Sequence, residues 1–173
     1  MFKSIVHKMT APSPSPAKGA GSTESKSVEY LYEGTSVKEY RVGKQSGGGS
    51  LFPRPSIIMV YAPWCPHCIS SVGEYTKLAD GIGDYVNVLA VNGDDPENKP
   101  FLSDYKIRGF PTLLYADEDT SLPAQGISEI DMTDTSRDLG GFVKKICLSN
   151  KQSESCCDTS TKPFKCSMKK LKI

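Results

Sequence analysis

Two neighbouring stretches of the chain carry different hydrophobic patterns. Ile57 to Ala62 is a continuous apolar run, which is typical of a central β-strand covered on both faces. After Cys68, apolar residues recur at helical spacing, at Ile69, Val72, Tyr75, Leu78 and Ala79. This pattern predicts an amphipathic helix over residues 66–82.

The rest of the chain continues this alternation. Further elements are predicted at residues 85–91 (strand), 100–105 (short helix), 112–115 (strand), 126–130 (strand) and 133–146 (helix). The helical crossover makes the first two strands parallel, whereas the last two strands can form an antiparallel hairpin. The chain is therefore predicted to be an α/β protein with a central mixed β-sheet flanked by helices.

The two ends of the chain differ from this core in composition. Residues 1–27 are rich in Pro, Ser, Ala and Gly and are predicted to be a flexible N-terminal arm. Residues 28–56 hold strand-like segments, read as a hairpin or as one edge strand and a loop, and a Gly-rich linker. The predicted domain covers residues 57–148, and residues 149–173 form a Cys- and Lys-rich tail.

Charge is distributed unevenly along the chain, although the net charge is only +1. Residues 1–56 carry +4, residues 57–143 carry −9 and residues 144–173 carry +6. Two explanations of this uneven charge are open. The segments are simply solvated and differ in the sign of their charge, or the basic ends dock on an anionic partner or on the domain itself. We expect no nucleic-acid partner.

No apolar run approaches the ~20 residues that cross a membrane as a helix. The first residues lack the sustained apolar region of a secretory signal, so we expect a cytoplasmic protein or a component of a larger assembly such as a virus particle. Six cysteines would instead suit an oxidising compartment, and the sequence leaves this conflict open.

Candidate chemistry lies between the first strand and the helix, in Trp64-Cys65-Pro66-His67-Cys68. A Cys-x-x-Cys at a helix N-terminus is typical of a redox-active dithiol, because unpaired N–H groups there stabilise a thiolate. A zinc site would need a second pair at this spacing, which the chain lacks, and an inert disulfide fits the flanking Trp64 less well. The pattern favours redox chemistry without a metal.

These residues resemble the thioredoxin superfamily, and most closely a protein disulfide isomerase catalytic domain. Tyr61-Ala62-Pro63-Trp64-Cys65 followed by His67-Cys68 is similar to the isomerase active site. Arg108-Gly109-Phe110-Pro111-Thr112 is similar to the cis-proline loop of the family. The resemblance covers residues 57–148 and implies a thioredoxin fold and a thiol–disulfide oxidoreductase acting on protein thiols or disulfides.

The resemblance also implies roles for single residues. Cys65 would attack, Cys68 would resolve the mixed disulfide, and no cofactor beyond the Cys65–Cys68 disulfide would be needed. Phe110 and a cis Pro111 would face the dithiol and contact substrate. Arg137 matches an arginine that assists the second cysteine, although a surface charge on the last helix explains it equally well.

Two departures from the isomerase pattern affect the expected chemistry. Pro66 replaces a glycine, and the resulting Cys-Pro-His-Cys is similar to the active site of the bacterial DsbA oxidants. His67 can stabilise the Cys65 thiolate, and a stabilised reduced form makes the disulfide a stronger oxidant. Met59 stands where the family carries a buried carboxyl group that assists proton transfer at the second cysteine, so resolution is slow or another group serves.

The remaining four cysteines follow the last predicted helix, at Cys147, Cys156, Cys157 and Cys166. Adjacent Cys156 and Cys157 would pair with each other only under strain, whereas each could pair with an outer cysteine and staple the tail. A four-thiolate zinc site has poor spacing here, and free thiols in a flexible tail are an equal alternative. These residues are candidate structural disulfides.

The sequence supports two functions of different classes. The first is an enzyme, a thiol–disulfide oxidoreductase that oxidises or isomerises protein disulfides. The alternative is a thioredoxin-fold structural or adaptor component of a larger assembly, docked through its basic arms, because fold alone does not fix function.

Overall fold

The computed structural model describes residues 28–41, 52, 54–116, 126–149, 157–158, 160 and 165–166. The predicted N-terminal arm, the Gly-rich linker and most of the C-terminal tail lie outside these residues. The described elements are β1 (Lys38–Glu39), β2 (Ser56–Tyr61), α1 (Pro66–Ile82), β3 (Asn87–Asn92), η2 (Pro96–Asn98), α2 (Lys99–Asp104), β4 (Thr112–Ala116), β5 (Ile127–Ile130), α3 (Leu139–Ser149), β6 (Cys157–Asp158) and β7 (Lys165–Cys166).

A five-stranded mixed sheet in the order β1-β3-β2-β4-β5 forms the centre of the molecule. β2 pairs with β3 in parallel, with Ile58 opposite Leu89, and with β4 in antiparallel orientation. β4 and β5 form the predicted antiparallel pair. The α/β class and the mixed sheet are confirmed, because the helical crossover after β2 requires a parallel neighbour.

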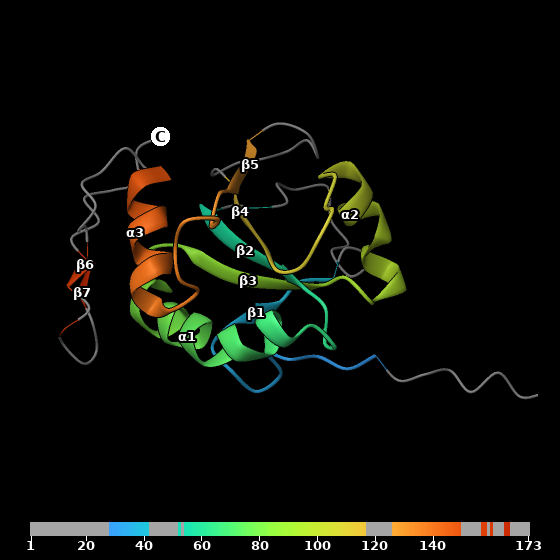
Figure 1. Cartoon of the computed structure of the whole chain (residues 1–173), viewed down its shortest axis with the longest axis horizontal. Helices are drawn as coiled ribbons and strands as arrows, with labels where there is room; N and C mark the ends of the chain where they lie inside the picture. Colours follow the sequence, from blue (N-terminus) through green and yellow to red (C-terminus); the bar gives the residue numbers. More distant parts are fainter. Residues whose placement is uncertain are drawn as a thin grey trace, which may run out of the picture.

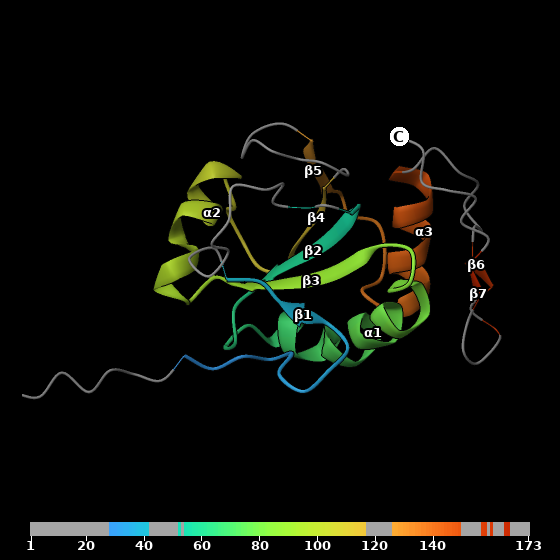
Figure 2. The same cartoon turned by 180° about the vertical axis from the view of Figure 1, so that it is seen from behind.

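Helices cover both faces of this sheet (Figures 1 and 2). α1 and α3 lie on one face, where Tyr75 of α1 and Phe142 of α3 pack with their rings 5.6 Å apart. α2 covers the other face, where Phe101 joins Ile58 and Val60 in a second apolar cluster. Every residue of β2 is buried, as the continuous apolar run predicts.

The N-terminal extension joins the domain through one edge strand, and the hairpin alternative is wrong. Residues 31–37 form turns and bends, and only Lys38 and Glu39 pair, in parallel with Leu89 and Ala90 of β3. The strand-like residues before the turn do not continue the sheet, but Tyr32 and Val37 are buried in the core beside α1.

The last helix begins later than the sequence predicts. Residues 133–138 form a turn in which Asp131 Oδ1 accepts a hydrogen bond from Thr133 N at 2.9 Å. The helix begins at Leu139, and Asp138 Oδ1 caps it by accepting from Gly141 N at 2.8 Å. Thr133 and Asp138 are both suited to a helix start, and local pattern alone does not decide between them.

The C-terminal tail is described only in part. β6 and β7 pair in antiparallel orientation, with Cys157 opposite Cys166. Cys147, buried in α3, is bonded in a disulfide. The side chains of the other three tail cysteines lie outside the described residues, so their pairing stays a prediction. Among the described helices, none is long and apolar enough to cross a membrane.

Candidate active site

The dithiol lies where β2 gives way to α1. Cys65 N donates to Ala62 O at 3.1 Å in a tight turn, and Cys65 O accepts from Ile69 N at 3.0 Å in the first turn of the helix. Pro66 occupies the first helical position, where its missing N–H removes no hydrogen bond. Cys65 is therefore the N-cap residue, beside unpaired N–H groups that favour a negatively charged sulfur.

Both thiols are free and nearly or fully buried, with Cys65 6% and Cys68 0% exposed. Burial raises the pKa of the Cys68 thiol to about 12. A backbone hydrogen bond with Ala62 and the positive charge of Arg137 lower it in part, while Cys65 raises it further. The two sulfurs are thus unequal: Cys65 is at the surface edge, and Cys68 releases its proton with difficulty.

Arg137 is exposed and lies in the bend before α3, not on the helix. Its charge nevertheless acts on Cys68, in the direction that favours a thiolate there. Arg137, although far from Cys68 in the sequence, is therefore close enough for its charge to act on that thiol.

Opposite the dithiol lies the loop before β4. The Phe110–Pro111 peptide bond is cis, and Phe110 O accepts a hydrogen bond from Cys65 Sγ at 3.5 Å. The Phe110 ring packs edge-on to Trp64, with ring centroids 6.1 Å apart. Trp64 is 65% exposed, so its indole and the Phe110 loop present an apolar surface beside the dithiol.

Two residues after β3 support this surface, and sequence reasoning missed both. Asp94 Oδ1 accepts a hydrogen bond from Trp64 Nε1 at 3.1 Å. A Cβ on Gly93 would lie 2.4 Å from the Phe110 ring, so only glycine allows Phe110 to pack there. The acidic turn in the sequence gives no sign that it would meet the cis-proline loop.

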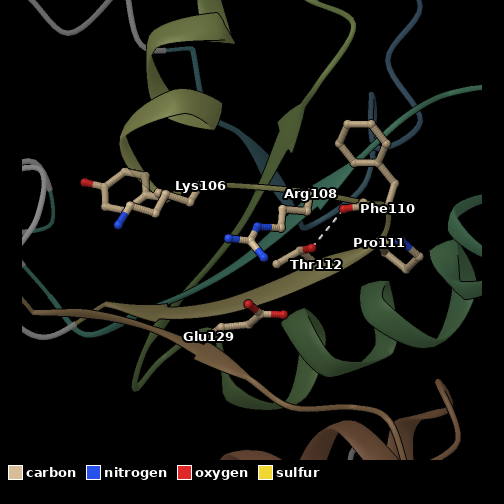
Figure 3. A pocket seen from close by; sticks show the side chains of 8 residues that line it. Lys106, Arg108, Phe110, Pro111, Thr112 and Glu129 are labelled. Carbon is tan, nitrogen blue, oxygen red and sulfur yellow. Dashed lines mark hydrogen bonds between the residues drawn. The ribbon is translucent and has the colours of Figure 1, made fainter.

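A pocket of about 650 Å³ continues from this loop. Figure 3 shows Phe110 and Pro111 at one end of it and Lys106 at the other. Arg108 and Glu129 carry opposite charges along its wall, and Thr112 Oγ1 is held by a 2.9 Å hydrogen bond to Gly109 O. The pocket is open and charged at the end far from the dithiol.

His67 is exposed on the first turn of α1, and its neighbour in the sequence, Pro66, is exposed too. Met59 is fully buried in the core between the sheet and α1 and has no proton to exchange. No cluster of three or more His, Cys, Asp or Glu side chains suited to a metal ion occurs in the described part of the chain.

A partly buried carboxyl group nevertheless lies beside the same core, on β1. Glu39 Oε1 accepts hydrogen bonds from Tyr61 Oη at 2.6 Å and from Tyr32 N at 3.3 Å. Burial raises the pKa of Glu39 to about 7, although the hydrogen bonds oppose the rise. Sequence reasoning missed this residue because its burial depends on the parallel pairing of β1 with β3, which is remote in sequence.

Known proteins share the segment that builds this site. A family model described as Thioredoxin matches residues 53–137. The chain is 41% identical over 59 residues to a mitochondrial thioredoxin domain-containing protein of Schizosaccharomyces pombe. This match covers 34% of this chain and 16% of that protein. The chain is also 45% identical over 60 residues to a protein disulfide-isomerase of Hordeum vulgare. This match covers 33% of this chain and 12% of that protein.

A longer match is 33% identical over 107 residues, to protein disulfide isomerase-like 2-3 of Oryza sativa, and covers 49% of this chain and 24% of that protein. The chain thus spans less than a quarter of the length of each of these relatives. Among solved structures, the Trx4 domain of ERdj5 superposes with a TM-score of 0.51 at 18% identity, covering 66% of this chain and 96% of that one. At this identity the likeness shows the fold alone.

Proposed function

Residues 53–137 of this chain form a thioredoxin-family domain, and from this premise we propose that the protein is a thiol–disulfide oxidoreductase that acts on protein substrates through Cys65 and Cys68. The observation that carries the proposal is the free Cys65–Cys68 dithiol at the start of α1, facing the cis-proline loop. The curated relatives named protein disulfide-isomerase support the same class of reaction.

Each half of the reaction conserves electrons. When Cys65 attacks a substrate disulfide as a thiolate, one substrate sulfur leaves as a thiolate and a mixed disulfide forms. Cys68 then attacks Cys65, the second substrate sulfur leaves, and the dithiol has given two electrons to the substrate. In the oxidising direction a substrate thiolate attacks Cys65 of the disulfide, and Cys68 is the leaving group.

The accessibility of the two sulfurs supports this division of roles. Cys65 lies at the edge of the surface formed by Trp64 and Phe110, whereas Cys68 is fully buried beneath it. An extended substrate chain along Phe110 and Pro111 would bring its sulfur to Cys65. The pocket beyond Pro111 offers room for the continuing chain.

The oxidising direction is favoured by Pro66 and His67. A positively charged His67 on the first turn of α1 would stabilise a thiolate at the adjacent helix N-terminus. Stabilising the reduced form raises the reduction potential of the couple. Arg137 would act on the other sulfur, because its charge favours a thiolate at Cys68 when Cys68 attacks or leaves.

The structural or adaptor role receives no support from the relatives or from the described residues. A trapping experiment separates it from the enzyme. Cys68→Ser removes the resolving thiol, so mixed disulfides between Cys65 and protein substrates should accumulate as reducible high-mass bands. Cys65→Ser is the matched control and should trap nothing, because Cys68 is buried. Equal trapping by both variants, or none by either, would refute the oxidoreductase.

A further inference from the structure

The pocket of about 650 Å³ beyond the cis-proline loop has charged walls that the exchange reaction itself does not need. The pocket begins at Phe110, whose carbonyl oxygen accepts the hydrogen bond from Cys65 Sγ at 3.5 Å. Arg108 is only two residues away along the chain, so its Cα atom lies within about 7 Å of the Cα atom of Phe110. A substrate chain that runs along this loop with its sulfur at Cys65 therefore passes the charged wall within a few residues of its own cysteine.

Three charged side chains line this pocket, namely Lys106, Arg108 and Glu129. All three are exposed, and none forms an ion pair or a side-chain hydrogen bond within the part of the chain that the structure describes. Arg108 and Glu129 are thus not paired with each other, although they line the same pocket. In Figure 3 Arg108 lies between Lys106 and the cis-proline loop. The pocket therefore carries an excess of positive charge that no neighbouring side chain neutralises.

The backbone at Lys106 is a second sign that its side chain serves the pocket. Among the described residues other than glycine, only Lys106 has a positive φ, of 52°. It directly follows the last residue of the α2 cap, and its N–H donates to Ser103 O at 3.1 Å. The next N–H, of Ile107, donates to Leu102 O at 2.9 Å.

Glycine is the preferred residue at this position of a helix end, because any other side chain is strained there. A cation does interact favourably with a helix C-terminus, but a lysine in the last turn would do so without the strained backbone. The end of α2 therefore does not account for Lys106. A pocket that uses positive charge at this end does account for it.

These charges favour one class of substrate side chain. The planar guanidinium group of Arg108 can bind a carboxylate through two parallel hydrogen bonds. A basic substrate side chain would meet two like charges in the same pocket, which disfavours binding. Glu129 weakens the preference for a carboxylate but does not reverse it, because one negative charge stands against two positive ones.

We propose that this pocket is a specificity subsite for an acidic side chain of the substrate, about two to four residues from the substrate cysteine. Arg108 binds the carboxylate, and Lys106 adds positive charge at the far end of the pocket. The inference rests on the proposed function and names its substrate class, which is polypeptides with Asp or Glu near the reactive cysteine. It adds no chemical step, since the exchange at Cys65 and Cys68 is the same for every substrate.

A set of short peptides tests the subsite with the full-length reduced protein. Each peptide carries one cysteine bonded to 2-thiopyridine through a disulfide, and one Glu, Gln or Lys placed two to four positions before or after that cysteine. Cys65 attacks the peptide sulfur and 2-thiopyridone leaves, which is followed by its absorbance. Cys68 then attacks Cys65 and releases the peptide as a thiol, so two electrons pass from the dithiol to the peptide disulfide.

Two controls isolate the contribution of the pocket to these rates. The rate of each peptide with dithiothreitol in place of the protein corrects for the intrinsic reactivity of its disulfide. The Cys65→Ser variant gives the background from other thiols. At one or more positions the corrected kcat/KM should be about fivefold higher with Glu than with Gln, and lower with Lys than with Gln. The preference should decline as salt is added, because exposed charges are screened.

Substitutions in the pocket should change the Glu-to-Gln ratio in opposite directions. Arg108→Gln and Lys106→Gln should each lower it about two- to threefold, whereas Glu129→Gln should raise it by a similar factor. Arg108→Lys keeps the charge but not the planar fork and should restore the ratio only in part. Lys99→Gln is the matched control, because it removes the same charge from an exposed lysine of α2 that does not line the pocket, and it should leave the ratio unchanged.

A glycine at position 106 separates the pocket from the helix end. Lys106→Gly removes the charge and relieves the backbone strain. It should therefore lower the Glu-to-Gln ratio as Lys106→Gln does, and at the same time raise the midpoint of urea unfolding. A lower midpoint would show that the lysine serves the helix end and would overturn its assignment to the pocket.

The outcomes for the subsite and for the enzyme are distinct. A wild-type ratio of one at every position would overturn the inference, and so would a preference for Glu that survives the double substitution of Arg108 and Lys106 with Gln. In both cases the peptides would still be reduced, and the proposed function would stand. Release of 2-thiopyridone no faster than with Cys65→Ser, for every peptide, would refute the proposed function instead.

Discussion

Replacing Glu39 with glutamine should make the stability of the protein less dependent on pH. Glutamine resembles neutral glutamic acid and keeps the oxygen that accepts from Tyr61 and Tyr32. The folded-state pKa of Glu39 is about 7, against an ordinary value of 4.5. Because the pKa is raised in the folded state, the stabilisation from the neutral group is fully present below pH 4.5 and is lost as the pH rises through about 7.

The magnitude follows from the same pKa values. Each pKa unit corresponds to about 1.36 kcal/mol, so the rise from 4.5 to about 7 gives an upper limit of about 3 kcal/mol. Glu39 is only partly buried, and solvent screening reduces the effect, so we expect about 2 kcal/mol. Relative to the wild type, Glu39→Gln should therefore gain about 2 kcal/mol in the free energy of unfolding between pH 4.5 and pH 8.

Urea unfolding followed by circular dichroism at several pH values measures this difference. Groups that titrate alike in both proteins cancel in the comparison. Glu29→Gln is the control, because its side chain is exposed and is not among the groups that act on Glu39, so this variant should keep the pH dependence of the wild type. A Glu39→Gln difference that is the same at pH 4.5 and pH 8 would refute the burial of Glu39 as described.

Three other substitutions test single contacts. Gly93→Ala should displace the Phe110 ring, because the added Cβ would overlap it. Disulfide exchange with a protein substrate should then slow about tenfold or more, as it does when a binding group is misplaced. An unchanged exchange rate would contradict the close packing of Gly93 and Phe110. Asp138→Ala removes the side chain that caps α3 and should lower the free energy of unfolding by about 1 kcal/mol, measured by urea titration. An unchanged free energy of unfolding would show that Asp138 does not cap the helix. His67→Ala should make the Cys65–Cys68 couple more reducing in glutathione equilibration, unless the helix N-terminus alone stabilises the thiolate.

Residues whose environment is set by near neighbours were predictable from the sequence. The apolar run of β2, the helical spacing of α1 and the Cys-x-x-Cys between them depend on period and local chemistry. The buried β2 and the α1 start at Pro66 agree with those predictions. The parallel pairing of β2 and β3 followed because a helical crossover permits little else.

Features set by contacts between distant segments were not predictable. The sequence leaves open whether Lys38 and Glu39 belong to a hairpin or to one edge strand, and only the neighbouring β3 edge selects them as a short parallel strand. Glu39 reads as an ordinary exposed charge until that pairing places it against Tyr61. Gly93 likewise gains its importance only when Phe110 arrives from the loop before β4.

Redox equilibration of the Cys65–Cys68 pair with glutathione, read by alkylation and mass spectrometry, tests the oxidoreductase directly. We expect a two-electron couple confined to Cys65 and Cys68. Its potential should lie nearer the roughly −120 mV of DsbA than the roughly −270 mV of thioredoxin, because Pro66 and His67 favour the thiolate. Failure of these two cysteines to form a disulfide over the whole range of glutathione potentials would contradict the oxidoreductase function.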